Sequence, residues 1–329
     1  MVTDRFTVGD FSLFVMYIPN VEEFVSRCGR FTTQYRQTKV SLSRLVEQLQ
    51  SNSPRTLLAK EKLNLKSAPV STALVQKSER DYLQELEVKD LSYTHPRSHS
   101  GISAINLTIR RGSFTVITGR VGSGKSTLLH VLLGLLPSSG GTITWNGDLV
   151  TEPDDFFVPP RVAYTPQVPK LFSQSLRDNN LLGLSEDDVN MEAAIYAGVM
   201  ERDVAELDQG LDTFVGPKGV RLSGGQIQRS AAARMFVRDA ELLVVDDLSS
   251  ALDVETEANL WERFSQSKSV TSLVVSHRRA TISRADHIVI LKDGKIESQG
   301  KLEQLLVESD EMQAVWNGVI RGDASTGTT

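Results

Sequence analysis

The stretch Gly119-Arg120-Val121-Gly122-Ser123-Gly124-Lys125-Ser126-Thr127 stands between two apolar segments. Residues 114–118 before it have the pattern of a buried strand, and residues 128–133 after it have the pattern of a helix start. A strand, a glycine-rich loop carrying Lys-Ser and a helix are together the context that a phosphate-binding loop requires. The sequence therefore predicts that this loop holds a phosphate.

The residue types of the loop suit that role. Gly122 and Gly124 allow successive backbone N–H groups to point at one anion, which a Cβ would obstruct. The start of the following helix adds partial positive charge at the same place. We expect Lys125 to reach the outer phosphates of a nucleotide and the Ser126 hydroxyl to bind Mg²⁺.

Composition narrows the class of protein. The chain has 329 residues, 40% of them hydrophobic, so it can bury a sizeable core. Its net charge of −5 argues against a general nucleic-acid binder. The single cysteine, Cys28, excludes an internal disulfide framework and suits a reducing compartment. No cleavable signal is expected, and the longest uncharged run near the N-terminus, residues 11–21, is shorter than the roughly 20 apolar residues that a membrane-spanning helix needs.

Residues 1–66 form a first predicted unit. Its apolar residues recur at steps of three and four, which is typical of a helical face, and Pro19 is expected to kink that helix. The apolar positions are Phe11, Phe14, Val15, Ile18, Val21 and Val25, with Leu42, Leu45, Val46 and Leu49 further along. Basic residues come after the first stretch, as in the cytoplasmic flank of a membrane span. An amphipathic helical hairpin packed on a partner explains the same pattern, and periodicity alone does not decide between the two.

The rest of the chain alternates between segments with the spacing of helices and segments with the pattern of strands. We predict a linker over residues 67–84, strands over 86–93, 102–109 and 142–145, and a turn at Asn146-Gly147. Mostly helical sequence extends over 175–240, then buried parallel strands at 242–245 and 272–275, a late strand at 288–291, a last amphipathic helix over 302–316 and a frayed tail at 321–329.

Two further motifs bear on the chemistry. Asp246 ends the strand 242–245, where a phosphate-loop enzyme places a ligand of Mg²⁺. Asp247 comes directly after it and is a candidate for orienting or deprotonating an attacking water. Twenty residues earlier, Leu222-Ser223-Gly224-Gly225-Gln226 opens a predicted helix, whose exposed N–H groups form a second anion site.

Taken in order, these motifs resemble those of the nucleotide-binding domain of an ABC transporter, over roughly residues 86–320. The resemblance adds a glutamine loop at Tyr164-Thr165-Pro166-Gln167, a signature at Leu222–Gln226 and a further loop at Ser250-Ala251-Leu252-Asp253. It also adds a switch histidine, His277, within Val275-Ser276-His277-Arg278, and an aromatic, Tyr93, ahead of the phosphate loop.

The resemblance implies a fold: an α/β P-loop NTPase of ABC type, with a RecA-like core, an antiparallel β subdomain and a helical subdomain. We assign this domain to residues 85–320. A helical segment precedes it.

The resemblance also implies ATP and Mg²⁺ as ligands, and a role for each matched residue. ATP would be bound by Tyr93, which stacks on adenine, and by Gly119, Arg120, Val121, Gly122, Ser123, Gly124, Lys125, Ser126 and Thr127. The metal ligands would be Ser126, Gln167 and Asp246, and the catalytic residues Asp247, His277 and Gln167. The signature residues Ser223, Gly224, Gly225 and Gln226 would bind the ATP held by an opposite subunit, because such domains pair head to tail.

Residues 1–66 carry a second, shorter resemblance over about 45 residues. Thr7-Val8-Gly9-Asp10-Phe11, an apolar stretch, then Tyr35-Arg36-Gln37 and Val40–Arg44 look like the last membrane helix of an exporter-type subunit and its cytoplasmic extension. This implies a remnant of a transmembrane domain at residues 1–66, a location at the cytoplasmic face of the membrane, and membrane helices as partners.

Two segments depart from the family pattern. The family's catalytic residue after the acidic strand is Glu, whereas this chain has Asp247, and Gly216-Pro217-Lys218-Gly219 replaces an acidic-basic pair before the signature. We therefore keep two main hypotheses: the ATPase portion of an exporter, and an ATP-gated dimerisation module with slow hydrolysis that pairs with a competent partner half. A soluble ABC ATPase of repair or translation is disfavoured by residues 1–66. The sequence does not identify a transported substrate.

Overall fold

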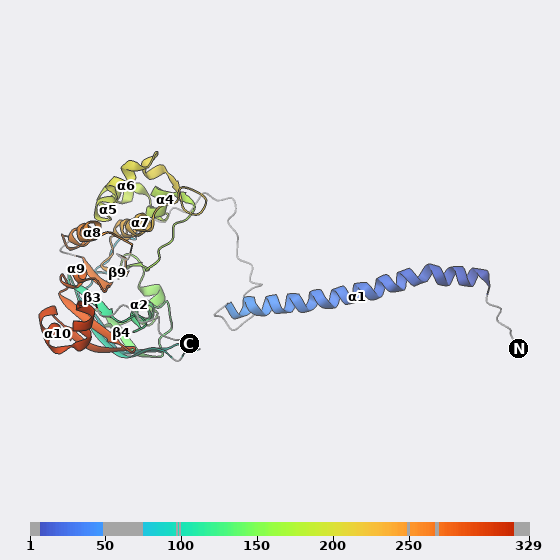
Figure 1. The fold of residues 1–329 in the computed structure, drawn as a ribbon, viewed down its shortest axis with the longest axis horizontal. Coiled ribbons are helices and arrows are strands. Elements are labelled where there is room, and N and C mark those ends of the chain that lie inside the picture. The colour runs from blue at the N-terminus through green and yellow to red at the C-terminus, as the bar shows by residue number, and fades with distance from the viewer. Residues whose placement is uncertain are drawn as a thin grey trace, which may run out of the picture. The chain divides into compact units, whose positions relative to one another are not determined.

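The computed structural model describes residues 7–48, 75–96, 98, 100–248, 251–266 and 270–318. The chain divides into two compact units, residues 1–68 and residues 69–329, and each is taken by itself. Figure 1 shows a single long helix in the first unit and a mixture of strands and helices in the second.

The described part of the first unit is one helix, α1 (Val8–Gln48). It begins with a reciprocal cap: the Thr7 N–H donates to the Asp10 carboxylate at 2.9 Å, and the Asp10 N–H donates to the Thr7 hydroxyl at 3.3 Å. At about 1.5 Å per residue, α1 is roughly 60 Å long. Pro19 lies inside the helix, which continues past it, so the described residues of this unit form one helix and not a hairpin.

The apolar side chains of α1 face solvent within this chain. Phe11, Phe14 and Val21 are 58–60% exposed. Among the described residues, no helix combines the length and the apolar character that crossing a bilayer requires. Predicted features between residues 49 and 74, including Leu49 and the first part of the linker, lie outside the described residues.

A six-stranded sheet is the centre of the second unit. Its order is β12-β11-β3-β10-β9-β6, with parallel pairing throughout except for β12, which is antiparallel to β11 at one edge. The strands are β3 (Phe114–Gly119), β6 (Val162–Thr165), β9 (Leu242–Asp246), β10 (Thr271–Val275), β11 (His287–Lys292) and β12 (Lys295–Gly300). The short apolar runs of the sequence thus form its central strands.

A four-stranded antiparallel sheet of order β2-β1-β4-β5 packs beside it. Its strands are β1 (Glu85–Thr94), β2 (Gly101–Arg110), β4 (Gly140–Trp145) and β5 (Asp148–Leu149). The predicted turn between β4 and β5 has positive φ at both central residues, 55° at Asn146 and 88° at Gly147, as a type I′ hairpin requires.

Helices gather in a third group. Figure 1 shows α4, α5, α6 and α7 together at one end of this unit, away from β3, α2 and β4. The helices of the unit are α2 (Lys125–Leu132), α3 (Pro153–Phe156), α4 (Leu176–Leu181), α5 (Met191–Ala197), α6 (Glu201–Glu206), α7 (Gly224–Val237), α8 (Val254–Gln266), α9 (Arg279–Ile282), α10 (Leu302–Glu308) and α11 (Asp310–Trp316). Two 3₁₀ turns, Glu186–Asp188 and Gly210–Asp212, and the short pair β7 (Gln174–Ser175) and β8 (Phe214–Val215) complete this part.

Both faces of the six-stranded sheet are buried. Successive side chains of a strand point to opposite faces, so Val244 packs in the core shared with α2 and the antiparallel sheet, whereas Val245 packs in the core shared with α7 and α8. A third core, which includes Leu176, Met191 and Met200, holds the helical group together. The α/β fold class predicted from the sequence is confirmed, with its parallel core, antiparallel sheet, helical group and preceding helix.

Two local features differ from the sequence predictions. The predicted helix over 302–316 is broken at Ser309, which is 1% exposed and caps α11 by accepting from the Met312 N–H at 3.0 Å. The described part of the predicted linker, residues 75–84, lies on the domain: Leu83 is fully buried, and Lys77 forms an ion pair of 2.8 Å with Glu241. The tail at 321–329 lies outside the described residues.

Candidate active site

The parallel sheet brings the phosphate loop, Gln167, Asp246, Asp247 and His277 to one edge. The carboxyl ends of β3, β10, β9 and β6 are neighbours, and register pairs Val275 with both Ile117 and Asp246, and Val245 with Thr165. The phosphate loop leaves β3, His277 follows β10, Asp247 follows β9, and Gln167 follows β6. Residues from four distant parts of the chain therefore line the same edge.

The phosphate loop has the backbone that its glycines permit. Gly119, Gly122 and Gly124 have φ of 138°, 83° and 100°. A Cβ at Gly119 would lie 2.1 Å from the Leu291 carbonyl oxygen, so this position admits no side chain. Gly124 is the left-handed residue immediately before α2, and α2 begins at Lys125, so the loop runs directly into a helix N-terminus.

Lys125 folds back over this loop. Its ammonium donates to the carbonyl oxygens of Gly119 at 2.9 Å and Arg120 at 2.7 Å. Burial lowers the pKa of the Lys125 ammonium, while the charges of Asp246 and Asp247 oppose that shift. Lys125 therefore ties the start of α2 to the first residues of the loop.

The residues proposed for Mg²⁺ all supply oxygen donors: a hydroxyl from Ser126, an amide oxygen from Gln167 and a carboxylate from Asp246. That set fits a hard cation that keeps waters and phosphate oxygens in its shell. Asp246 is 4% exposed, and burial together with its charge raises the pKa of Tyr164 to about 12. Within the described ranges, no cluster of three or more His, Cys, Asp or Glu side chains is placed to hold a metal.

Asp247 has an unusual environment. Its φ is 46°, in the left-handed region, and its N–H donates to the Val275 carbonyl at 3.0 Å. The Gln167 side-chain N–H donates to its Oδ2 at 3.4 Å, whereas Oδ1 is buried without a hydrogen-bond partner. Burial raises the pKa of this carboxyl, helped by Asp246 and opposed by His277 and by Arg278. An orphaned buried oxygen beside the phosphate loop is what a polar reactant would satisfy.

The signature residues lie elsewhere. Ser223 and Gln226 form a reciprocal capping box at the start of α7, with bonds of 2.8 and 3.2 Å. The Gln226 amide and the Arg229 guanidinium both donate to Asp203 of α6. The predicted second anion site is thus the start of a helix of the helical group, and Figure 1 draws α7 with α4, α5 and α6, away from α2, which the phosphate loop precedes.

The ring of Tyr93, which is predicted to stack on adenine, is buried. Its ring is 6% exposed and belongs to the core between the two sheets. His95, two residues on, is exposed and stands edge-on to the Tyr93 ring at 5.8 Å between centroids. A base can stack only on an exposed ring face, so the accessible ring here is His95, and the assignment of adenine to Tyr93 stays a prediction.

Sequence reasoning missed several supporting residues. Asp203 holds the signature helix, and Glu311 of α11, 3% exposed, accepts from Arg120 of the phosphate loop at 2.6 Å. Arg278, next to His277, donates to the Leu252 carbonyl. Their partners are between 26 and 191 residues away, and no local pattern marks them. In the loop predicted at 250–253, Ser250 lies outside the described residues.

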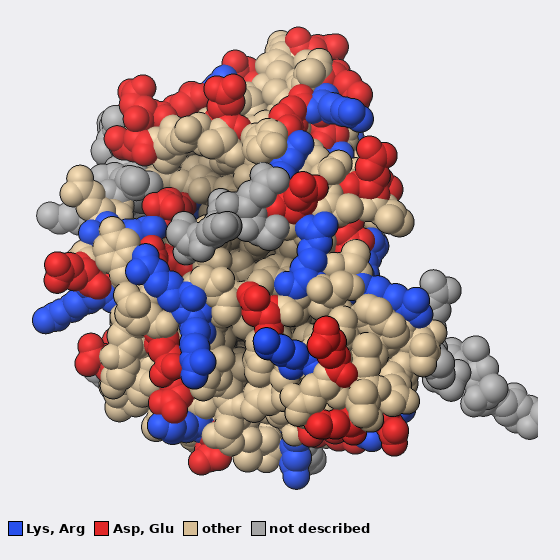
Figure 2. Space-filling model, turned by 90° about the vertical axis from the view of Figure 1, so that its left-hand side faces the viewer, with Lys and Arg blue, Asp and Glu red and all other residues tan. Residues whose placement is uncertain are grey.

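A cavity of about 650 Å³ lies apart from this edge. It is lined by Glu87 and Lys89 of β1 and by residues at the amino ends of β3 and β11, including Thr115 and Asp286. None of the predicted site residues lines it. Figure 2 shows acidic and basic side chains interspersed on the face that it draws, with acidic ones frequent over the helical group at the top.

Comparisons with known proteins agree on one family. Residues 102–250 match the family model described as ABC transporter. The chain is 29% identical over 326 residues to ATP-binding cassette sub-family B member 6 of Xenopus tropicalis, covering 98% of this chain and 36% of that protein. It is 35% identical over 222 residues to the probable multidrug resistance ABC transporter ATP-binding/permease protein YheI of Bacillus subtilis, covering 67% and 38%. The chain thus spans less than two-fifths of these relatives.

A solved structure shares the fold. The structure of a bacterial Atm1-family ABC exporter with ATP bound matches with a TM-score of 0.68 at 23% sequence identity, covering 97% of this chain and 54% of that one. At this identity the likeness concerns the fold alone. Because the match covers nearly the whole chain, it extends beyond the sheets to the N-terminal segment.

Proposed function

Because this chain belongs, through residues 102–250, to the ABC transporter family, we propose that it binds and hydrolyses ATP as the nucleotide-binding subunit of an exporter-type transporter. One observation carries the proposal: Ile117 of β3, just ahead of the phosphate loop, and Asp246 of β9 pair with the same residue, Val275 of β10. The predicted phosphate site and the acidic residues proposed for ATP hydrolysis therefore lie at the same edge of the sheet.

The chemistry follows from the residues at that edge. The loop N–H groups and Lys125 hold the phosphates of ATP, and His277 contacts the outer phosphate. Asp247 takes or orients the proton of the attacking water, with its Oδ2 fixed by Gln167. Mg²⁺, held by Ser126, Gln167 and Asp246, would supply charge neutralisation on the phosphate oxygens.

We further propose that two such domains pair head to tail. The start of α7 is an anion site that lies apart from the phosphate loop of its own chain, so a second subunit must bring its ATP to Ser223, Gly224 and Gly225. Closure of the pair on ATP and its reopening after hydrolysis would drive the membrane helices of the transporter.

The first unit supports a place at the cytoplasmic face of the membrane. Both long matches cover 97–98% of this chain, so they extend over most of residues 1–66. The apolar side chains of α1 are exposed within the chain, as expected of a helix whose partners are other helices. We therefore assign residues 1–66 to a transmembrane domain and residues 85–320 to the nucleotide-binding domain.

Asp247 favours one alternative: an ATP-gated dimerisation module that hydrolyses slowly and pairs with a competent partner half. Its carboxylate is one methylene shorter than Glu, and its environment raises its pKa. The phosphate loop and signature, which carry binding, retain their motifs.

Phosphate release from Mg·ATP by the detergent-solubilised full chain tests both candidates, with Lys125→Ala as the matched control. Release by the parent chain, lost in the control, supports the ATPase. ATP-dependent pairing without release supports the alternative. If the parent chain binds ATP no better than the control, both candidates are wrong.

A further inference from the structure

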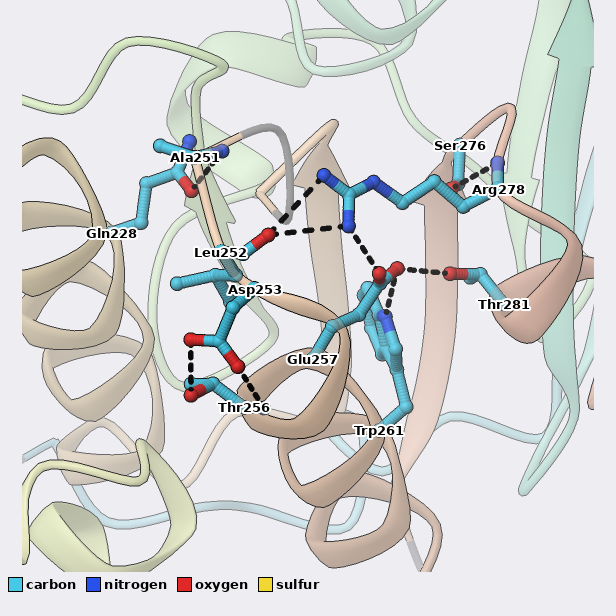
Figure 3. Close-up of polar contacts among 10 residues, drawn as sticks. All are labelled: Gln228, Ala251, Leu252, Asp253, Thr256, Glu257, Trp261, Ser276, Arg278 and Thr281. Carbon is cyan, nitrogen blue, oxygen red and sulfur yellow. Dashed lines mark hydrogen bonds and ion pairs between the residues drawn. The ribbon is translucent and has the colours of Figure 1, made fainter.

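Residues 251–252, which come shortly after Asp247 in the chain, are held from two sides. On one side, the Ala251 N–H donates to Oε1 of Gln228 on α7 at 3.0 Å. On the other, the guanidinium of Arg278 donates to the Leu252 carbonyl with both terminal nitrogens, each at 3.4 Å. Figure 3 shows this loop between α7 and the segment that follows β10. It is thus tied both to the signature helix and to the neighbour of His277.

The contact with α7 is tight as well as hydrogen-bonded. A Cβ at Gly225 would lie 3.1 Å from the Ala251 carbonyl oxygen and 3.5 Å from Cδ2 of Leu252. Close-packed groups transmit displacement, since there is no free space to absorb it. There is thus no room for a side chain between the start of α7 and residues 251–252.

A buried carboxylate fixes the other side. Glu257 of α8 is 3% exposed and pairs with Arg278. The same carboxylate accepts from the Trp261 indole N–H at 3.3 Å and the Thr281 hydroxyl at 3.2 Å, as Figure 3 shows. With three donors on one carboxylate, Arg278 has little freedom to turn away.

The start of α8 is fixed independently. Asp253 caps the helix by accepting from the Thr256 N–H at 2.9 Å and from its hydroxyl at 2.7 Å. Glu257 therefore projects from a rigid helix and not from a mobile loop. A rigid support is what a side chain needs if it is to set the position of another.

We propose that Glu257 and Arg278 are a positioning pair that holds His277 and residues 251–253 in register with the start of α7. Keeping the Glu257 carboxylate charged while it is buried is costly, so an ion pair of this kind is weak evidence for stability alone. Here the same guanidinium also donates to the Leu252 carbonyl, so the pair links the signature side of the loop to the segment that carries His277. The ATP-dependent half of this inference rests on the proposed function.

The test compares two buried-glutamate variants of the full chain, Glu257→Gln and Glu241→Gln. Glu241 is a matched control because it is 7% exposed, pairs with Lys77 at 2.8 Å and precedes β9, at the end of the strand away from the site. Amide hydrogen exchange without nucleotide is the first measurement. We expect faster exchange at residues 251–253 and 276–281 in Glu257→Gln only. Equal exchange in both variants and the parent would overturn the pairing role.

The second measurement is ATP turnover. A misplacement of about 1 Å at a reacting centre can cost on the order of 100-fold, so we expect kcat to fall by roughly 10- to 100-fold in Glu257→Gln while KM stays within about twofold. Glu241→Gln should lose thermal stability but keep kcat. A kcat equal to that of the parent would contradict the inference.

A double variant separates positioning from simple stabilisation. Glu257→Gln with Arg278→Gln removes both charges, so it should recover part of the lost melting temperature while kcat stays low. Recovery of both together would show that the pair is merely structural. Hydrogen exchange needs no ATP, so it tests the pair even in a chain that releases no phosphate. Faster exchange of the loop in Glu257→Gln would then support the pair, and the missing phosphate release would count only against the proposed function.

Discussion

Replacing Asp247 with Asn should make the protein more stable while it stops turnover. The side chain is 8% exposed, one carboxylate oxygen has no partner, and burial raises the pKa of the group. The folded state therefore penalises the charged form. Asn is neutral, nearly isosteric, and among the few residues that tolerate the left-handed φ of 46° found there.

The size of the effect comes from linkage. Each unit by which folding raises a carboxyl pKa costs about 1.4 kcal/mol of stability at neutral pH. In a domain of this size, 1 kcal/mol shifts the melting temperature by roughly 2–4 °C. We therefore expect Asp247→Asn to melt above the parent at pH 7.

The stability difference between the two proteins depends on pH. Below the ordinary pKa value of 3.8 the carboxyl is protonated in both the folded and the unfolded chain, so the penalty is absent. As pH rises towards the raised pKa, the unfolded chain ionises first and the parent loses stability relative to Asp247→Asn. The gap in melting temperature should open above about pH 4 and level off above the folded pKa.

Differential scanning fluorimetry of both proteins between pH 4 and 8 measures this gap. Phosphate release by the parent should rise with pH over the same window, because only the ionised carboxylate is a base. A gap that is constant with pH, or an Asn variant that melts below the parent at pH 7, would refute the argument from burial.

The same geometry supports three other predictions. Lys125→Ala should abolish or severely weaken ATP binding, because a charge-assisted contact to phosphate is lost; unchanged affinity for a fluorescent ATP analogue would remove the phosphate-site assignment. Tyr93→Ala should lower the melting temperature by emptying a core position, whereas His95→Ala should cost about 1–3 kcal/mol of ATP affinity if His95 stacks on the base; the opposite pattern would support stacking of adenine on Tyr93. A fragment of residues 75–329 should stay in solution without detergent, while the full chain needs it and a fragment starting at residue 85 aggregates for lack of the buried Leu83; equal behaviour of all three would contradict this.

Much of the fold was accessible from sequence because its signals are local. The runs at 242–245 and 272–275 are apolar throughout or nearly so, since both faces of their sheet are covered, and Asn146-Gly147 has the conformation its turn needs. The edge at which Asp246 meets the phosphate loop results from one rule, that carboxyl ends of parallel strands are neighbours.

The features that could not be predicted from the sequence depend on contacts between residues far apart in the chain. Lys77 and Asp81 look like part of a polar linker until their partners Glu241 and Arg161 are placed beside them. The sequence predicts Glu257 to be a solvent-exposed charge on an amphipathic helix, although it is buried and pairs with Arg278. No periodicity distinguishes such residues from solvated charges, because their burial depends on the tertiary fold.

The left-handed backbone conformation at Asp247 affects the outcome of replacing it with Glu, the residue that the family has at this position. Left-handed φ costs roughly 1–2 kcal/mol for residues other than Gly, Asn and Asp, so Asp247→Glu must either bear that strain or shift the turn after β9. If the turn shifts, the longer side chain carries its carboxylate about 1 Å nearer to the phosphate, and turnover should rise by up to the order of 100-fold that such a distance is worth. If Glu leaves the rate unchanged and Asn abolishes it, Asp247 is already a fully placed base. The slow-site alternative would then be wrong, and a pair of identical chains would suffice.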